Sequence, residues 1–411
     1  MKKIAIIGGG ITGCLIALYL KKKKYKVEIF EKKKNLGGII NDLKFNGDFY
    51  FNGPNFFDVK SWWIKILKED KAFNKIFSKF KLNYGSFNDL FGQEIYSNDF
   101  AQIVTNKKFK KINKKKDLSY VSRINCYQNE ISSEIFKWSK RFCKDILKLH
   151  EDCSLIMNTS RVFFKKDIIK IKKLKLKDKL SNEILGIPNK NYTDNQYYIP
   201  KKGFEEFFKI LEKYLKRNKI KINFESKIQI KLENNKTYLS NKNEKLNFDF
   251  TLWCANPVQM LRNLNIGELD NPIVKVHVLA LDLSLNNKFK GNKYIQIFSK
   301  KFNLFRIFLY KINNQIKMSL EILHDRTNDL KKEINFALKI LNKNGYYVNE
   351  QILRAQRKEV RHLLFTKSDL KKMKSFEKKQ KDFKIISGGW YKIGRDKKLD
   401  YIINNLKKLI M

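Results

Sequence analysis

The sequence predicts an α/β protein, with a mixed α+β organisation overall, and three features at the start of the chain support this. Residues 3–7 form a short apolar run that is typical of a buried parallel strand. A glycine-rich turn follows at 8–13, and the apolar stretch 14–20 ends in lysines, as a helix does at its C-terminus. Residues 25–30 form a second apolar strand. Together these segments predict one βαβ unit.

Length and composition set the scale of the fold. The chain has 411 residues, which allows two or three domains at roughly 100–200 residues each. Hydrophobic residues make up 43% of the chain and aromatic residues 13%, so the sequence can bury a sizeable core and does not have the composition of a disordered protein.

The formal net charge of +46 raises the question of a polyanionic partner. Most of the positive charge comes from lysine side chains. The lysines occur in runs along the whole chain, such as 21–24, 107–116 and 371–381. Arginine, the better residue for bidentate phosphate and base contacts, is scarce. We therefore interpret the charge as a compositional bias of the solvated surface. Nucleic acid is not an expected partner, and a membrane surface is an alternative that the pattern does not favour.

Cysteine usage and hydropathy bear on location. The five cysteines include no CxxC pair, so neither a metal site nor a disulfide framework is predicted, and a reducing compartment, the cytoplasm, fits best. The first predicted strand begins at residue 3 and the glycine loop follows it, so we expect no signal peptide. No stretch approaches 18 uninterrupted apolar residues, so no transmembrane helix is expected.

The turn at 8–13 has the spacing Gly-x-Gly-x-x-Gly between a strand and a helix, which is typical of a dinucleotide site. Gly8 permits the tight turn, Gly10 lets a pyrophosphate approach the helix N-terminus, and Gly13 lets helix and strand pack closely. Glu31, at the end of the next strand, can accept hydrogen bonds from a ribose diol. The predicted contacts with the ADP half of the cofactor are made by Gly8, Gly10, Ile11, Thr12, Gly13, Glu31 and Lys32.

Periodicity predicts the remaining elements. Helices are expected over residues 60–82, 129–150, 161–187, 203–217, 328–344 and 396–410. Strands are expected at 220–224, 227–232, 236–239, 248–254, 273–283, 293–299, 303–311, 315–322 and 383–387.

A second glycine motif leads to a family. Asn35-Leu36-Gly37-Gly38 follows the ribose acid by six residues and resembles the second fingerprint of the glutathione-reductase-type FAD flavoproteins. That family includes amine oxidases, protoporphyrinogen oxidase, phytoene desaturases and UDP-galactopyranose mutase. The resemblance implies that the dinucleotide is FAD, with Gly37 and Gly38 beside its ribityl and phosphate region.

The segment from Phe49 to Phe57 resembles the Gly-Pro-His segment that lines the flavin in the mutases. The resemblance assigns Gly53, Pro54 and Asn55 to the cofactor site, and we expect Asn55 to act at the flavin. Asn55 replaces the histidine of the mutases. An amide can hydrogen-bond a flavin but cannot titrate near neutral pH, which argues against mutase chemistry.

Later segments resemble the same family in order and spacing. Residues 198–204 are similar to its Pro-x-x-Gly-aromatic entry into a helix. The strand at 219–224 and the residues up to Ile228 would contact the adenine, and Ala255 ends the strand beside the ADP moiety. Residues 386–395 resemble the C-terminal glycine turn at the flavin, and this implies roles for Gly389 and Trp390.

Arg306 lies in an apolar strand-like run, where an arginine needs an anionic partner. The mutases have an arginine for the substrate diphosphate in a similar context, so Arg306 is a candidate catalytic residue. The alternative is a surface-facing position on the strand. Arg161 and Arg361 are further candidates for a cleft.

The resemblance implies a discontinuous FAD domain at 1–85, 196–260 and 376–411, and a substrate domain at 86–195 and 261–375. The expected function is an FAD-dependent oxidoreductase that takes a hydride from a small-molecule substrate to flavin N5. One alternative is a mutase-like isomerase that acts on a nucleotide sugar with reduced FAD. Another is a non-catalytic flavoprotein, or a binder of a polyanion or membrane surface.

Overall fold

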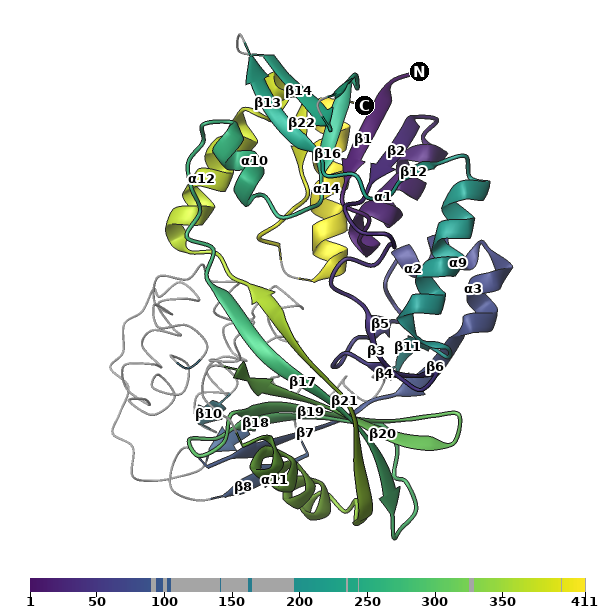
Figure 1. The fold of residues 1–411 in the computed structure, drawn as a ribbon, viewed down its shortest axis with the longest axis vertical. Helices are drawn as coiled ribbons and strands as arrows, with labels where there is room; N and C mark the ends of the chain where they lie inside the picture. The colour runs from purple at the N-terminus through teal and green to yellow at the C-terminus, as the bar shows by residue number, and fades with distance from the viewer. Residues whose placement is uncertain are drawn as a thin grey trace.

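The structure is a computed structural model, and its fold contains two large sheets, one above the other in Figure 1. The N- and C-termini both lie at the end of the molecule that contains the smaller of these sheets. The residues that the structure describes are 1–89, 94–98, 102–104, 141, 162–164, 196–233, 236–242, 244–324, 329–392 and 394–410.

The upper sheet is a five-stranded parallel sheet in the order β12-β2-β1-β16-β22. Its strands are β1 (Lys3–Ile7), β2 (Lys26–Phe30), β12 (Lys221–Asn223), β16 (Phe250–Trp253) and β22 (Ile385–Ser387). Side chains alternate between the two faces of a strand, so Ile4 and Ile6 pack into one core while Ala5 and Ile7 pack into another. Both faces are buried, as the continuous apolar runs predict.

Helices cover one face of this sheet and a mixed layer covers the other. The helices on the first face are α1 (Ile11–Lys22), α9 (Gly203–Arg217) and α14 (Arg395–Leu409). The second face packs against a small antiparallel sheet and three short helices. These are β13 (Gln229–Glu233), β14 (Lys236–Asn241), β15 (Glu244–Leu246), α10 (Val258–Asn263), α12 (Lys367–Lys378) and α13 (Gln380–Phe383).

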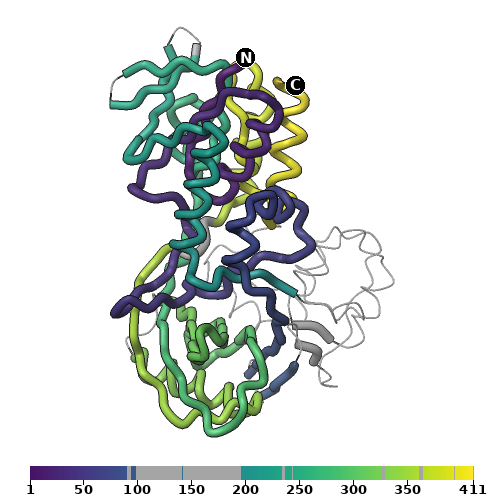
Figure 2. Tube along the Cα trace, turned by 90° about the vertical axis from the view of Figure 1, so that its right-hand side faces the viewer, coloured from purple at the N-terminus to yellow at the C-terminus, as the bar shows by residue number. Residues whose placement is uncertain are grey.

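The lower sheet has seven strands in the order β21-β17-β20-β19-β18-β7-β8. Its strands are β7 (Asn83–Asn88), β8 (Ile95–Ser97), β17 (Ile273–Leu285), β18 (Lys293–Phe298), β19 (Leu304–Ile312), β20 (Gln315–Leu323) and β21 (Val348–Leu363). Only β18 and β7 pair in parallel. Helix α11 (Leu330–Lys343) packs on one face of this sheet, and the view in Figure 2 again separates the two sheets.

Smaller elements connect the two sheets. The segment after the second glycine pair forms a hairpin of β3 (Asp42–Phe45) and β4 (Asp48–Phe51). Strands β5 (Phe57–Asp58), β6 (Phe77–Lys81) and β11 (Gln196–Pro200) form a three-stranded antiparallel sheet, with α2 (Trp63–Lys68) and α3 (Lys71–Ile76) between β5 and β6 in the chain. Strands β9 (Gln102–Val104) and β10 (Val162–Phe164) pair in parallel.

Most of the expected elements are present, and the helix at 203–217 has the bounds that its periodicity predicts. Two expectations are partly wrong. The helix expected over 60–82 becomes α2, α3 and strand β6, because residues 77–81 pair with β11. Residues 162–164, expected within a helix, form strand β10. Of the helix expected at 129–150, all but residue 141 lies outside the described residues, as does most of 161–187.

The α/β fold class is confirmed, because a parallel sheet with helices lies beside a mainly antiparallel one. The five-stranded sheet takes its strands from 3–30, 221–253 and 385–387, and the seven-stranded sheet takes its strands from 83–97 and 273–363. We propose that these two groups are the cores of the FAD domain and of the substrate domain.

Candidate functional site

The glycine-rich loop between β1 and α1 is held in a tight turn. The N–H of Gly8 donates to the carbonyl of Phe30 at 2.8 Å, and Gly8 has a φ of +110°. A Cβ on Gly13 would lie 2.2 Å from the carbonyl oxygen of Gly8, so only glycine permits this approach. Gly10 differs, because a Cβ there would meet nothing nearer than the Cα of Gly38, at 3.9 Å. The space in front of Gly10 is therefore open.

The N-terminus of α1 faces this loop. Gly10 is the N-cap residue of the helix, and no side chain caps the first turn. Ile11 is buried and Thr12 is half-buried at the start of the helix. The free N–H groups of a first helical turn and the helix dipole attract an anion. The open space and the uncapped turn fit the pyrophosphate of a dinucleotide.

Glu31 contacts the glycine loop directly. Its carboxylate is buried, and Oε2 accepts from the N–H of Gly9 at 2.7 Å. Oε1 accepts from the N–H of Lys33 at 2.9 Å, while the neighbouring Lys32 is exposed. Glu31 therefore holds the loop in shape, a structural role that the sequence analysis did not foresee. Its hydrogen bond to a ribose, and the cofactor contact of Lys32, stay predictions.

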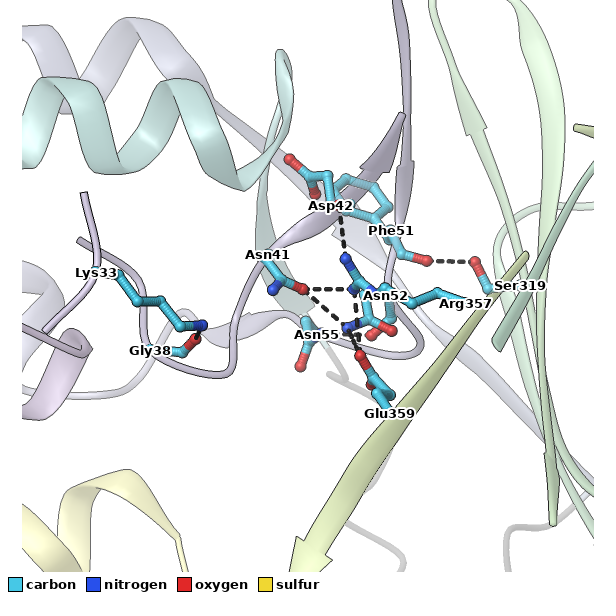
Figure 3. Close-up of polar contacts among 10 residues, drawn as sticks. All are labelled: Lys33, Gly38, Asn41, Asp42, Phe51, Asn52, Asn55, Ser319, Arg357 and Glu359. Atoms are coloured by element: carbon cyan, nitrogen blue, oxygen red, sulfur yellow. Dashed lines mark hydrogen bonds and ion pairs between the residues drawn. The ribbon is translucent and has the colours of Figure 1, made fainter. Parts of the chain in front are cut away.

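The second glycine pair lies against the first loop. The N–H of Gly37 donates to the carbonyl of Gly9 at 3.0 Å. A Cβ on Gly38 would be 3.3 Å from the Cα of Gly10, and both Gly37 and Gly38 have positive φ angles. Lys33 Nζ donates to the carbonyl of Gly38 at 3.2 Å (Figure 3). The two fingerprints, which are separate in the sequence, thus form one continuous backbone surface.

The segment at 53–55 follows directly on β4, which is attached to the seven-stranded sheet. The N–H of Phe51 donates to Tyr310 Oη at 2.9 Å. Ser319 Oγ donates to the carbonyl of Phe51 at 2.5 Å (Figure 3). Gly53 has a φ of +73°, and Asn55 Nδ2 donates to the carbonyl of Asn52 at 2.6 Å. The segment that leads into the turn is therefore held against β19 and β20 of the seven-stranded sheet.

A polar network connects this turn to the long strand β21 (Figure 3). Asn52 Nδ2 donates to Glu359 Oε2 at 2.9 Å and to Asn41 Oδ1 at 3.1 Å. Arg357 Nη2 donates to the same oxygen of Asn41 at 2.6 Å and lies 3.2 Å from Glu359 Oε2. The network joins the residues after Gly38 to those before Gly53, so it holds the two segments that are predicted to contact the cofactor in a fixed arrangement.

Asn52 also provides a test of whether a ligand fits. Its side chain is fully buried, yet its Oδ1 has no hydrogen-bond partner among the described residues. A buried amide oxygen without a donor is costly. An acceptor without a donor, in the residue that precedes Gly53, fits a ligand that carries N–H or O–H groups, as a flavin and its ribityl chain do.

The C-terminal turn lies beside the end of β16. A Cβ on Gly388 would be 2.3 Å from the carbonyl oxygen of Trp253, so glycine is required there. The N–H of Gly389 donates to Ser387 Oγ at 3.2 Å, and Trp390 Nε1 donates to the carbonyl of Trp253 at 2.9 Å. The indole N–H of Trp390 therefore holds the turn against the end of β16. The expected contacts of Gly389 and Trp390 with the flavin remain predictions.

Ala255 and Ile228 both pack in the core on the second face of the five-stranded sheet. A Cβ on Gly8 would be 3.1 Å from the backbone N of Ala255, which places the backbone of Ala255 against the glycine loop. The side chain of Ile228 is buried in this core. Only the backbone of Ile228 is thus left for the predicted adenine contact.

Arg306 has an anionic partner inside the protein. It lies on β19, and its Nη1 donates to Glu321 Oε2 on β20 at 2.9 Å. Arg306 is 9% exposed and Glu321 is 1% exposed, so the surface-facing alternative is wrong. The pair accounts for an arginine in an apolar strand without any substrate. Arg161 and the side chain of Arg361 lie outside the described residues.

Sequence reasoning missed the residues that arrange the site around the glycines. These are Asn41, Asn52, Arg357 and Glu359. Two of them lie on β21, which the periodicity did not predict. A weak signal exists in Asn41 and Asn52, since asparagines flanking a hairpin commonly bond to nearby backbone or side chains, but nothing local points to β21 as their partner.

Comparisons with known proteins agree with this geometry. Residues 6–69 match the family model for an NAD(P)-binding Rossmann-like domain. A 1-hydroxycarotenoid 3,4-desaturase from Flavobacterium sp. is 46% identical over 59 residues, which is 14% of this chain and 12% of that protein. A 4,4'-diapophytoene desaturase from Staphylococcus aureus is 44% identical over 52 residues, or 13% and 10%. The chain thus matches about a tenth of the length of these relatives.

Solved structures show the same fold over the whole chain. A reduced UDP-galactopyranose mutase has a TM-score of 0.69 at 12% identity and covers 100% of this chain and 97% of its own. A candidate protoporphyrinogen oxidase from Exiguobacterium sp. 255-15 has a TM-score of 0.58 at 12% identity, with 99% and 98% covered. A putrescine oxidase variant has a TM-score of 0.58 at 9% identity, with 100% and 99% covered.

These comparisons define the class of fold. The chain matches the model of a Rossmann-like domain at residues 6–69 and has the fold of these solved structures, which include a mutase and oxidases of the kinds that its glycine motifs resemble. Within the described residues, no helix is long and apolar enough to cross a membrane.

Proposed function

We propose that the protein is an FAD-dependent oxidoreductase that acts on a small-molecule substrate. The observation that carries the proposal is the contact between the two glycine fingerprints, in which Gly37 bonds to Gly9 and Gly38 lies against Gly10. The glycine-rich loop at 8–13 alone could bind any dinucleotide. The joined surface continues from the N-terminus of α1 towards the turn at Gly53, which supports a cofactor as long as FAD.

The chain's own residues would bind and orient the cofactor. The first turn of α1 offers N–H groups to the pyrophosphate, and the network of Asn41, Asn52 and Glu359 fixes the turn that would line the flavin. When bound, FAD supplies the hydride acceptor at N5. The aromatic side chains Phe56 and Tyr197, with ring centres 4.4 Å apart, lie next to that turn and support an apolar substrate site from which water is excluded.

The isomerase alternative receives less support. It needs an arginine that is available for a diphosphate, whereas Arg306 forms a buried ion pair with Glu321. It also loses the titratable group that the mutases have where this chain has Asn55. Oxidation of a C–H bond by bound flavin needs neither an arginine freed from the ion pair of Arg306 nor a titratable group in place of Asn55. We therefore favour this reaction.

Gly10 offers a sharp test of the cofactor site. Gly10 has a φ of −73°, which any residue adopts, and its Cβ position is open. The Gly10→Ala protein should therefore fold like the wild type, while its methyl group takes the space that the pyrophosphate needs. Losing one or two charge-assisted hydrogen bonds should weaken FAD binding by about a hundredfold.

The measurement is a titration of apo-protein with FAD, followed by the quenching of flavin fluorescence, with thermal unfolding of the apo-protein as the control for folding. Wild type should bind FAD, and Gly10→Ala should bind far more weakly at an unchanged Tm. NAD is the competing ligand. A wild-type protein that binds NAD but not FAD, or neither, refutes the proposal.

The reaction class is tested on the FAD-loaded protein without oxygen. Amines, polyenes, porphyrinogens and nucleotide sugars are added in turn, and bleaching of the flavin absorbance reports hydride transfer. A compound that bleaches the flavin and is recovered as its oxidised product supports the oxidoreductase. Binding of a UDP-sugar only after reduction with dithionite, with isomerisation and no net bleaching, would favour the mutase instead.

A further inference from the structure

Helix α12 presents a stripe of lysines to solvent. Residues three and four positions apart lie on the same side of a helix. At this spacing, the outer side of α12 carries four exposed lysines, which are Lys367, Lys371, Lys374 and Lys378. The opposite side is buried, with Met373 and Phe376 in the core on the second face of the five-stranded sheet. We call the four exposed lysines the lysine stripe.

The acidic side chains of this helix do not neutralise the stripe. Asp369 is buried, and its carboxylate accepts from the N–H groups of Asp270 at 2.7 Å and Asn271 at 3.1 Å. Glu377 is half-buried and accepts from Tyr391 Oη at 2.9 Å. The exposed Asp382 lies beyond the end of the helix, on α13. Both carboxylates of α12 are therefore used inside the protein.

Lysines on other helices have acidic partners. Lys209 and Lys216 of α9 each pair with a glutamate four positions earlier, and Lys339 of α11 pairs with Glu94 at 2.7 Å. In the part of the chain that the structure describes, none of the four lysines of the stripe forms such a pair. A compositional bias explains the number of lysines, but it does not explain why acidic partners are missing from this surface. Like charges one turn apart repel one another, so an anionic surface that docks here is attracted strongly.

The buried side of α12 contacts the C-terminal turn that is expected at the flavin. The ring centres of Phe376 and Trp390 are 5.7 Å apart. Next to them, Tyr391 Oη donates to Glu377 of the same helix, and Gln380 Oε1 on α13 accepts from the N–H of Ser387 at 2.7 Å. The stripe and the turn therefore lie on opposite sides of one helix, whose diameter is about 10–12 Å.

The proposed reaction requires a partner that removes electrons. Each oxidation of a substrate leaves the two electrons of the hydride on the flavin, and an acceptor has to take them before the next turnover. A small acidic electron-carrier protein matches the charge of the stripe, and docking there would bring it within one helix of the flavin turn. Such carriers bind through small interfaces that depend on charge.

Two other polyanions match the stripe less well. An anionic membrane is held by basic side chains together with apolar ones that insert among the lipids, and α12 exposes no large apolar side chain. Nucleic acid is bound best by arginine, and α12 contains none. An electron carrier needs neither feature.

We propose that the lysine stripe of α12 is the docking surface for a small acidic electron-carrier protein that reoxidises the flavin. Two oxidised carrier molecules each accept one electron in turn, and the proton that remains from the hydride is released to water. The inference rests on the proposed function, because it needs an FAD that has been reduced.

The probe is the soluble haem domain of cytochrome b5, an acidic one-electron carrier, and the basic cytochrome c is its counterpart of opposite charge. The stripe variant combines Lys371→Gln, Lys374→Gln and Lys378→Gln. Its matched control combines Lys209→Gln, Lys213→Gln and Lys216→Gln, which remove the same charge from exposed positions of α9. Helices α9 and α12 cover opposite faces of the five-stranded sheet (Figure 1).

Binding of cytochrome b5 is measured first, by calorimetry at low salt on the proteins without FAD. The stripe variant should bind about tenfold more weakly than the wild type, and the α9 control should stay within about twofold. The FAD-loaded proteins are then photoreduced without oxygen and mixed with oxidised carrier in a stopped-flow instrument. The rate constant with cytochrome b5 should fall about tenfold in the stripe variant and should fall in the wild type as salt is added. The rate constant with cytochrome c should not fall in the stripe variant.

Several results would overturn the proposal. They are a wild type that neither binds nor reduces cytochrome b5, equal losses in the stripe variant and the α9 control, and an equal loss with both cytochromes. Weaker binding of the stripe variant to phosphatidylserine vesicles, with unchanged rates for cytochrome b5, would assign the stripe to a membrane instead. If the stripe variant does not retain FAD, Lys374→Glu replaces it, with a loss of about fivefold expected and an unchanged rate refuting the docking surface.

The failure of this inference differs from the failure of the proposed function. A wild-type protein that binds no FAD refutes the proposed function, whereas a wild type that binds FAD, with a stripe variant that binds and reduces cytochrome b5 normally, refutes only the docking surface.

Discussion

Replacing Asp42 by asparagine should change how the stability of the protein depends on pH. Asp42 begins the hairpin that follows the second glycine pair, and its Oδ2 accepts from the N–H of Glu205 at 3.0 Å, at the start of α9. No side chain from within α9 caps this end of the helix. Burial raises the pKa of Asp42 from 3.8 to about 6, although its hydrogen bonds to the helix N–H groups oppose the shift.

The sign and size of the change in unfolding free energy follow from the linkage between proton binding and folding. Because the pKa of Asp42 is raised in the folded state, the folded protein holds this proton more tightly than the unfolded chain does. The associated stability is complete below pH 4 and is lost as the pH rises through about 6. A shift of about two pH units corresponds to roughly 3 kcal/mol, and Asp42→Asn removes this dependence. The variant should therefore gain roughly 3 kcal/mol relative to the wild type between pH 4 and pH 7.

The assay is urea unfolding of both proteins at a series of pH values in this window. Glu212→Gln, changed at a half-buried carboxylate of the same helix that pairs with Lys216, controls for the loss of one negative charge. The two unfolding free energies should converge in acid and separate towards neutral pH. Parallel curves for wild type and Asp42→Asn would refute the argument that burial of Asp42 costs the folded state at neutral pH.

Two further substitutions have clear expectations. Gly13→Ala puts a Cβ 2.2 Å from the carbonyl oxygen of Gly8, so we expect a loss of a few kcal/mol in stability together with loss of FAD binding, measured by thermal unfolding and FAD titration; an unchanged Tm would contradict it. Glu321→Gln removes the carboxylate that pairs with the buried Arg306 and should cost about 3–5 kcal/mol in urea unfolding. A loss below 1 kcal/mol would show that the guanidinium is neutralised by another group.

The sequence predicted the part of the site whose requirements are local. Gly13 must be glycine because the carbonyl oxygen of Gly8, in the same loop, would lie 2.2 Å from a Cβ at that position. Such needs leave a spacing pattern that one sequence can reveal. The helix at 203–217 was predicted to the residue for a similar reason, since its apolar face repeats at helical spacing throughout.

The arrangement around those glycines could not be predicted because it depends on distant partners. Asn52 bonds to Glu359, 307 positions later in the chain. Strand β21 has no clear alternation, since most of its side chains from 351 to 360 are exposed or half-buried at an edge of the sheet. Residues 77–81 were expected to continue a helix, and pairing with β11 decided otherwise.

The same distinction applies to Arg306, whose partner comes from another strand. The sequence made Arg306 a candidate site residue because an arginine in an apolar strand needs an anionic partner. In the structure, strand pairing supplies Glu321 as that partner. The charge on β19 is therefore satisfied within the sheet, and the sequence alone could not show this, because Glu321 lies 15 positions later and is brought opposite Arg306 only by the pairing of β19 with β20.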